Sequence, residues 1–544
     1  MLRTAQYDTI ARTGQGTLAF SAFVLLAAVL GRVGHLYADP SYDELYHILA
    51  AQSWLTDGSL RLHQGSYERT PIFTALTGWM FWLADEPNLA MARLPGVLFG
   101  SLGAAAAALW SRQVAGPAVG WIVAFFVVFW PSGIQLSQTI RFYTLHGLLF
   151  FVAAVAVYQL FAPRRKAATR LALTLVALTA VLSAKLFQDS TLVGVLGLAI
   201  WAAGFVALPI LLRLRYRMVI LVILSALLLA AVAAAFASGM LASIWAKYTI
   251  SPWGRDVTAY HRVFSRFYPA VWSLTPLLAI LALRSFPRPA AFCTTLVVVG
   301  LIVHSFAGVQ NVRYIYYLTP FLFTLWAMGL AVLVPALARM MQRALRGFRG
   351  PLGHGRAPQF ALAFIACFAL VTQDAIPASV KLMLGRFAVP LARVADWSEA
   401  RPQVERLVDD GALIVTNDDL SALYYLGGFD VVFSNNWLPE MNNTEFARDP
   451  RTGRPLISDP ASLRALVRAY PHGAFVVSVE WWKQWPKNNS IGALLQAFDV
   501  PGVSLSTQRA GPVWILRWQG PAPGADDDAS RAVRAIVDPG KWAR

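Results

Sequence analysis

Charged residues are scarce in this chain of 544 residues: 14% are Asp, Glu, Lys or Arg, while 57% are hydrophobic. Soluble globular proteins carry roughly 25% charged residues. The shortage excludes an ordinary soluble protein and predicts a membrane-embedded one. Cysteine is scarcer still, because only Cys293 and Cys367 occur, both inside apolar runs and without metal-ligand spacing. We interpret both as small buried hydrophobic side chains.

The sequence also lacks a basic face, a cleavable leader and an internal repeat. The formal net charge is +17, but Lys and Arg collect in short segments between apolar runs, which excludes a nucleic-acid partner. The first apolar run, 17–36, has no convincing small-residue cleavage site, so we predict that it stays as a span. No repeat relates two halves of the chain, as it does in many transporters.

Apolar runs of bilayer length are abundant, and a spanning helix needs about 20 residues. Basic short loops favour the cytoplasm, so the N-terminus and the segments 164–166, 213–217 and 339–356 are predicted to be cytoplasmic. An odd number of spans then places the first loop, 37–92, and the C-terminal region outside. The basic segment 339–356 is interpreted as a topology anchor for anionic lipid. The predicted spans, about eleven, are 17–36, 93–112, 116–131, 142–162, 168–187, 191–212, 217–239, 268–284, 289–308, 314–335 and 359–377.

The pattern changes at about Ser379, where apolar runs shorten and turn residues become frequent. Short apolar stretches alternate there with helical ones, which predicts a soluble α/β domain over 379–520 and a flexible tail over 521–544. Residues 1–378 are the predicted transmembrane domain. The expected elements are strands at 412–417, 430–434 and 474–480, helices at 418–425, 459–470 and 490–499, and a hairpin at 503–518.

Two adjacent acids, Asp43 and Glu44, follow the first span, where apolar sequence meets the outer loop. Carboxylates near a bilayer are expensive and favour a functional reading. A carboxylate at a water-excluding mouth can take a proton from an attacking hydroxyl, and Asp43 is our candidate for that base. The alternative is that one of the two acids caps a helix that starts near Tyr42.

A second charged cluster, Glu68-Arg69-Thr70-Pro71, lies in the same loop. Proline fits the first turn of a helix, so the run 72–83 is predicted to be an amphipathic interfacial helix. Arg69 is placed to face a phosphate, and Glu68 to hold a metal ion or the acceptor. The alternative is a simple surface pair between Glu68 and Arg69.

Several basic residues are predicted on the outer side, against the positive-inside rule, and each needs an anionic partner. Phosphate oxygens would supply one, because guanidinium groups bind them in a bidentate way. The alternatives are lipid headgroups, or pairing with Asp189 or Asp256. Arg141-Phe-Tyr143 and Arg313-Tyr314 each directly open a span. The set is Arg141, Lys185, Arg255, Arg262, Arg266 and Arg313.

The histidines show no metal-ligand spacing. His47 follows Glu44 by three residues and is interpreted as a hydrogen-bonded neighbour rather than a ligand. His261, in the outer segment 247–266, is a weak metal candidate.

Four stretches together resemble a known family. They are Tyr42-Asp-Glu-Leu-Tyr46, Glu68-Arg-Thr-Pro71, Ala92-Arg-Leu-Pro-Gly96 with Phe99-Gly100, and Arg313-Tyr314 followed by Pro320. They resemble the GT-C membrane glycosyltransferases, and more narrowly the protein O-mannosyltransferase and aminoarabinose-transferase superfamily. The resemblance covers residues 20–335.

The resemblance implies a reaction and roles for residues. Such enzymes take a sugar from a polyprenyl-phosphate carrier on the periplasmic or lumenal side and usually invert the anomeric centre. Asp43 would be the base, Glu68 and Arg69 the acidic–basic pair, and Arg313 part of the carrier-phosphate environment. Some members bind a metal and others need none, so a divalent cofactor is left unassigned. Many relatives carry a second acid in the next outer loop, but 131–141 contains none.

The sequence therefore predicts a multi-pass α-helical glycosyltransferase of the GT-C type in the inner (plasma) membrane. Its donor is a polyprenyl-phosphate-linked sugar, and its acceptor is a lipid, a polysaccharide or a protein. Asp43 and Glu44 are the predicted catalytic residues. A polyprenyl-lipid transporter or flippase is the alternative, and a non-catalytic membrane sensor ranks last. The predicted substrate-binding residues are Glu68, Arg69, Arg141, Tyr143, Arg255, Arg262, Arg266, Arg313 and Tyr314.

Overall fold

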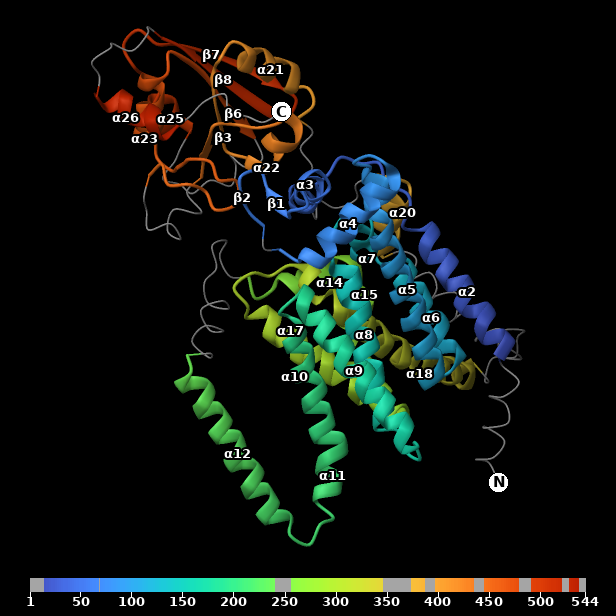
Figure 1. Cartoon of the computed structure of the whole chain (residues 1–544). Coiled ribbons are helices and arrows are strands. Elements are labelled where there is room, and N and C mark those ends of the chain that lie inside the picture. The colour runs from blue at the N-terminus through green and yellow to red at the C-terminus, as the bar shows by residue number, and fades with distance from the viewer. Residues whose placement is uncertain are drawn as a thin grey trace. The chain divides into compact units, whose positions relative to one another are not determined.

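A computed structural model of the chain describes residues 14–67, 69–239, 256–345, 373–386, 397–434, 445–478, 491–520 and 528–537. The chain divides into two compact units (Figure 1). The first, here called the helical unit, comprises Met1–Leu36, Arg93–Gln138 and Phe142–Val389. The second, the mixed unit, comprises Tyr37–Ala92, Thr139–Arg141 and Pro390–Arg544. The first outer loop thus belongs to the same compact unit as the C-terminal region.

Helices make up the helical unit, and most lie where the apolar runs predict them. They are α2 (Gly14–Leu30), α5 (Leu89–Ala115, whose first turn lies in the mixed unit), α6 (Pro117–Val128), α7 (Pro131–Ser137), α8 (Tyr143–Leu160), α9 (Ala167–Phe187), α10 (Thr191–Ala202), η1 (Ala203–Ala207), α11 (Leu208–Leu211), α12 (Arg217–Ala237), α14 (Ala259–Phe267), α15 (Pro269–Ser273), α16 (Thr275–Ser285), α17 (Pro287–Ser305), η2 (Val312–Leu318), α18 (Thr319–Leu345) and α20 (Ala375–Met383).

Six helices in the described residues are long and apolar enough to cross a membrane, or seven if the bent pair α6–α7, with its 58° angle, counts as one span. The chain is a multi-pass membrane protein. The predicted number of about eleven spans stays a prediction, and the last predicted span, 359–377, lies mostly outside the described residues.

Two predicted boundaries are wrong. The span 268–284 is broken between α15 and α16, where Pro276 in the first turn of α16 has no N–H to continue a helix. The predicted cytoplasmic loop 339–356 begins as helix, because α18 continues to Leu345.

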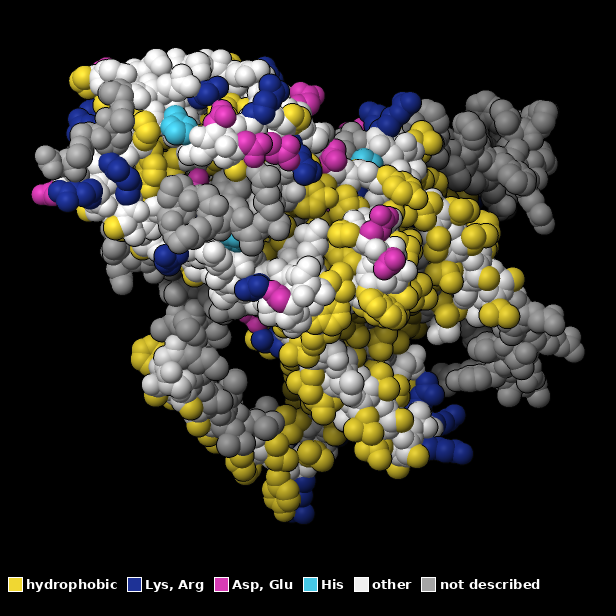
Figure 2. All heavy atoms as spheres, turned by 45° about the horizontal axis from the view of Figure 1, so that its top comes forward, with side chains coloured by type: hydrophobic (Ala, Val, Ile, Leu, Met, Phe, Trp, Pro, Cys, Tyr) yellow, Lys and Arg dark blue, Asp and Glu magenta, His cyan; other side chains and the backbone are white. Residues whose placement is uncertain are grey.

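The outside of the helical unit suits lipid. On α9, Leu171, Leu175, Leu178, Leu182 and Leu186 are all exposed. Figure 2 shows hydrophobic side chains over much of the visible face of this unit, with Lys and Arg gathered at helix ends. Its interior is aromatic, since Trp110 makes edge contacts with Phe151, Tyr158, Phe292 and Phe321.

The mixed unit contains a six-stranded sheet. Its strand order is β5-β4-β3-β6-β8-β7. The first four strands in that order are parallel, and β8 and β7 continue antiparallel. The strands are β3 (Leu413–Thr416), β4 (Val431–Phe433), β5 (Leu456–Ile457), β6 (His472–Ser478), β7 (Ser504–Ala510) and β8 (Val513–Gln519).

Helices flank this sheet: α21 (Arg401–Asp409), α22 (Asp419–Ser421), η4 (Ala422–Leu426), α23 (Pro460–Ala469), α25 (Ile491–Gln496) and α26 (Asp528–Ile536). The predicted strands, hairpin and helices are confirmed, while α21 and β5 were not predicted. Residues assigned to the tail form α26, and Val537 is buried in the core beside Leu463, Phe475 and Trp518. The boundaries predicted between the membrane domain, the soluble domain and the tail stay a prediction.

The first outer loop adds α3 (Tyr42–Asp57), β1 (Arg61–Leu62), β2 (Gly65–Ser66) and α4 (Pro71–Ala84) to the mixed unit. Helix α4 lies where the interfacial helix is predicted, with Pro71 at its first position, but it is not amphipathic, because its polar side chains Thr74 and Thr77 are buried. It exposes Ile72, Trp79 and Trp82 on one side and buries Phe73 and Phe81 on the other.

Candidate active site

Helix α3 starts with a capping box that uses Glu44. Ser41 has extended backbone angles, and its N–H and hydroxyl donate to Glu44 Oε2 at 2.8 and 2.9 Å. The other oxygen, Oε1, accepts the backbone N–H of Ile140 at 2.8 Å. The helix-cap alternative therefore describes Glu44, which also ties the segment Thr139–Arg141 to the start of α3.

Asp43 lies in a different environment from its neighbour. Its side chain is 28% exposed, against 2% for Glu44 as a whole. Arg141 Nη1 donates to the Asp43 carbonyl at 2.8 Å and lies 3.7 Å from the carboxylate Oδ1. Asp43 thus offers a reachable carboxylate beside a fixed cation, an arrangement that can accept a proton and stabilise negative charge.

His47 lies one helical turn after Asp43 and is buried. Its Nδ1 is 2.8 Å from Thr74 Oγ1 and 2.9 Å from the Tyr67 hydroxyl. Burial holds the pKa of His47 well below its ordinary value, and the nearby cations Arg141 and Arg69 lower the pKa further. His47 is thus hydrogen-bonded to its neighbours in this loop, while its exclusion as a ligand stays a prediction. Its contacts with Tyr67 and Thr74 connect α3 to the loop before α4 and to α4 itself.

Arg69 lies in the same loop and is exposed. Its guanidinium lies over the ring of Tyr46, 4.1 Å from the ring centre, which orients the group by cation–π attraction. Within the described residues no carboxylate pairs with it, so its donors are available to a ligand. Glu68, its predicted partner, lies outside the described residues.

An ionic cluster that sequence reasoning missed surrounds Tyr42. Arg451 Nη2 lies 2.8 Å from Asp419 Oδ2, and Arg451 Nη1 donates to the hydroxyls of Tyr42, at 3.1 Å, and Tyr46. Tyr42 in turn donates to Asp419 Oδ1 at 2.9 Å. No local pattern could reveal this cluster, because about 400 residues separate its two halves, and the nearest signal was the acid pair after β3.

Three of the predicted outer basic residues contact residues that are close to them in the sequence. Arg262 pairs with Asp256 and Lys185 with Asp189, so the pairing alternative holds for both. Arg266 lies 5.6 Å from the ring centre of Phe267. Arg255 lies outside the described residues.

Arg313, Tyr143 and Tyr314 come together in the helical unit. The Arg313 guanidinium lies 5.8 Å from the ring centre of Tyr143 and 5.3 Å from that of Tyr314. The side chain of Asn311 accepts the Arg313 N–H at 3.1 Å and fixes the start of η2. The structure thus groups three predicted residues that span 170 positions of sequence.

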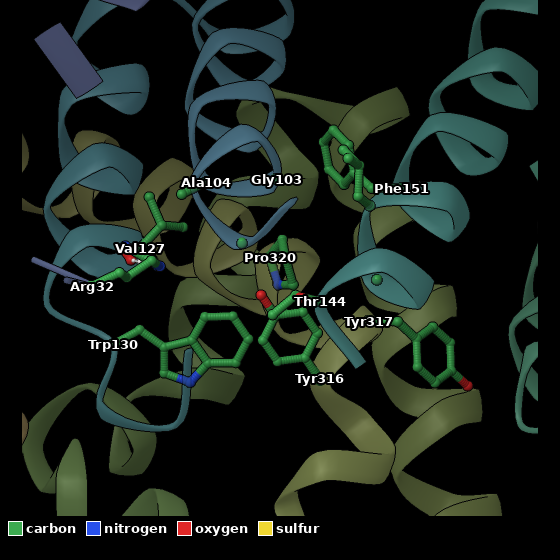
Figure 3. Close-up of a pocket in the computed structure, with 13 residues that line it drawn as sticks. Arg32, Gly103, Ala104, Val127, Trp130, Thr144, Phe151, Tyr316, Tyr317 and Pro320 are labelled. Carbon is green, nitrogen blue, oxygen red and sulfur yellow. Dashed lines mark hydrogen bonds between the residues drawn. The ribbon is translucent and has the colours of Figure 1, made fainter. Parts of the chain in front are cut away.

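A small cavity of about 20 Å³ lies in the helical unit (Figure 3). Trp130 and Tyr316 stack in its wall with ring centres 4.6 Å apart. Arg32, fully buried at its edge, donates to Ser137 Oγ and to the carbonyls of Ala28 and Val127. All three acceptors are neutral. They belong to α2, α6 and α7, so Arg32 connects these three helices.

Possible metal ligands do not converge in the described residues: no group of three His, Cys, Asp or Glu side chains is close enough to hold an ion. His261 instead accepts the indole N–H of Trp272 at 3.0 Å. We therefore assign no residue to a metal.

Solved structures with the same architecture exist. ArnT from Cupriavidus metallidurans, bound to undecaprenyl phosphate, matches with a TM-score of 0.56 at 16% identity, over 93% of this chain and 98% of that one. The archaeal oligosaccharyltransferase AglB from Archaeoglobus fulgidus, in complex with an inhibitory peptide and a dolichol-phosphate, matches with a TM-score of 0.54 at 13% identity, over 92% and 74%. The chain has the GT-C fold.

At these identities the likeness establishes the fold, which the sequence predicted. No protein-family model and no curated protein matches the chain.

Proposed function

We propose that the protein is an integral-membrane glycosyltransferase that moves a sugar from a polyprenyl-phosphate carrier to an acceptor hydroxyl outside the cytoplasm. The GT-C fold supports the class, because solved structures that share it include ArnT with undecaprenyl phosphate and AglB with dolichol-phosphate. The observation that carries the proposal is the partly exposed Asp43 carboxylate at the start of α3, held beside Arg141.

The reaction is a direct displacement. The acceptor hydroxyl gives its proton to Asp43 as its oxygen forms a bond to the anomeric carbon. The bond between that carbon and the carrier phosphate oxygen breaks, and the phosphate leaves with the electron pair. Attack opposite the leaving group inverts the anomeric centre.

Arginine side chains stabilise the charge that develops on the leaving phosphate. Arg69 is the first candidate, since it is exposed, oriented by Tyr46 and without a carboxylate partner among the described residues. Arg141 stabilises charge at Asp43, and Arg313 keeps the carrier-phosphate role that the resemblance implies. Preorganised charge of this kind contributes more to such rates than proton transfer alone.

Glu44 has a different task from Asp43. Both of its oxygens already accept hydrogen bonds from Ser41 and Ile140. We assign it to positioning: it orients the first turn of α3 and brings Arg141 to Asp43.

The test is transfer from radiolabelled polyprenyl-phosphate sugars to membrane extract, with the purified protein and its Asp43→Asn variant. Label that moves only with the parent protein supports the proposal and identifies donor and acceptor fractions. Full activity of the folded variant removes Asp43 from the mechanism. Absence of transfer from every donor, with lipid movement across vesicles instead, would favour the flippase.

The orientation is part of the same proposal: the N-terminus is cytoplasmic, and residues 37–92 and 379–520 are outside. The two basic turns, 164–166 between α8 and α9 and 213–217 around the start of α12, support it. Labelling of single cysteines in intact cells, placed at exposed Tyr37 and at Arg165, checks it: only the first should react with an impermeant reagent.

A further inference from the structure

The segment Asp449–Arg454 of the mixed unit forms a tight turn that holds itself together. Asp449 is fully buried, and its Oδ2 accepts the hydroxyl of Thr452 at 2.7 Å and the Thr452 N–H at 3.2 Å. Gly453 has a φ of +73°, a conformation that side chains rarely adopt. The turn therefore holds the Arg451 side chain and the carbonyls of Pro450 and Thr452 in a fixed arrangement.

One face of this turn contacts the start of α3. Arg451, with a side chain only 13% exposed, pairs with Asp419 and donates to Tyr42 and Tyr46. Tyr42 directly precedes Asp43 in the chain. The guanidinium of Arg451 therefore adds a second hold on the first turn of α3, beside the capping box of Glu44.

The other face contacts the β1–β2 hairpin. The carbonyls of Pro450 and Thr452 accept the N–H groups of Ser66, at 2.8 Å, and Gln64, at 3.2 Å. A Cβ on Gly65 would lie 2.1 Å from the Arg451 carbonyl, so only glycine allows this approach. The hairpin leads within three residues to Arg69.

The β1–β2 hairpin is not firmly held by its own strands. The hairpin has two residues in each strand, and an isolated hairpin of that kind is marginal in water. We propose that the turn Asp449–Arg454 positions Asp43 and Arg69 for transfer, with Arg451 as the positioning residue. The inference rests on the proposed function, because it concerns the geometry of that site.

Variants of both faces test the inference. Arg451→Met removes the ion pair and both donated bonds. Gly65→Ala disturbs the turn from the hairpin side, where the new Cβ would meet the Arg451 carbonyl. Tyr42→Phe is the milder variant, since it leaves the Arg451–Asp419 pair in place. Arg401→Met, which breaks the exposed Arg401–Glu405 pair of the same unit, is the matched control.

We expect kcat to fall roughly 10- to 100-fold in Arg451→Met, because small displacements of catalytic groups have effects of this size. The KM for the acceptor and the melting temperature of the helical unit should change little. Arg451→Lys, which keeps the charge but not the fork, should recover part of kcat. Tyr42→Phe and Gly65→Ala should show smaller losses of the same kind, and Arg401→Met none.

Hydrogen exchange of residues 42–46 and 61–66 provides a readout that does not need activity. Faster exchange there in Arg451→Met, with α8 and α17 unchanged, supports the coupling even if the parent protein transfers no sugar. If the parent is inactive, the proposed function fails and the exchange result still stands. Unchanged exchange, or an unchanged kcat in folded Arg451→Met, would overturn the inference. Equal loss of protection throughout the protein would mean that Arg451 contributes only to general stability. This result would also overturn the inference.

Discussion

Arg141 holds Asp43 at two points: its Nη1 donates to the carbonyl oxygen at 2.8 Å and lies 3.7 Å from the carboxylate. The two residues are 98 positions apart, and Glu44 brings them together through the N–H of Ile140. Glu44 therefore fixes the surroundings of Asp43, and the proposed function gives the two acids separate roles.

Asp43→Asn should abolish transfer while the melting temperature stays within a degree or two of the parent. The amide keeps the shape of the side chain but cannot take the acceptor proton, and general-base loss lowers rates by about 10²–10⁴-fold. Asp57→Asn, at the exposed end of the same helix, is the control and should keep full activity. Transfer at the parent rate by Asp43→Asn would contradict the assignment.

Glu44→Gln, unlike Asp43→Asn, should lower the stability of the folded protein. A glutamine amide has one acceptor oxygen in place of two, so the N–H of Ile140 or the Ser41 donors would be left without an acceptor. A buried unsatisfied group costs about 1–3 kcal/mol. Thermal or denaturant unfolding in detergent would measure the loss. A fully stable but inactive Glu44→Gln would show that Glu44 acts in the chemistry.

Arg69→Ala should weaken donor binding roughly 10- to 100-fold, the expected worth of charge-assisted hydrogen bonds. Arg69→Lys should recover only part, because an ammonium neither stacks on Tyr46 nor binds two phosphate oxygens at once. Arg262→Ala is the comparison, since Asp256 already neutralises Arg262. Binding of polyprenyl phosphate to the purified variants measures both. Equal losses at the two positions would mean that general positive charge, not placement, matters.

Acid should loosen the hairpin of the first outer loop. His63 accepts a hydrogen bond from Arg454 Nε at 3.1 Å, and burial, with Arg454 and Arg61 nearby, lowers the pKa of His63 from 6.5 to about 4. The unfolded chain takes up the proton first, so the stabilising contribution is complete above pH 6.5 and is lost as pH falls toward 4.

Hydrogen exchange of residues 61–66 at pH 7 and pH 5, corrected for intrinsic rates, measures this loss. His63→Gln, which keeps an acceptor but does not titrate, should remove the pH dependence. An unchanged pH dependence in that variant would assign the effect to another group, such as His47.

Local chemistry was enough to predict many elements. The length of apolar runs located most of the helices, and Pro71 and the apolar stretch behind it located α4. Alternating short strands and helices predicted the sheet of the mixed unit. The failures were equally local, because Pro276 interrupts a run whose hydrophobicity alone suggested one span.

The site was only partly predictable for a different reason. Asp43 and Arg69 stand out because charge is rare in apolar surroundings. Arg451 does not stand out, because its surroundings in the sequence are polar and its partners lie far away in the chain. The assignment of the helix cap to Glu44 also needed the structure, since adjacent acids look alike until the donors that face them are known.

By itself the sequence determined that the chain enters a membrane and where its helices lie, because hydrophobic length is a property of consecutive residues. It also determined which carboxylates and guanidinium groups are unusual enough to suggest chemistry. Only the tertiary structure decided that Glu44 is buried while Asp43 stays partly exposed, and that a turn at 449–454 contacts both α3 and the hairpin. Hydrogen bonds and burial depend on distance in space, and distant partners leave no trace in local composition.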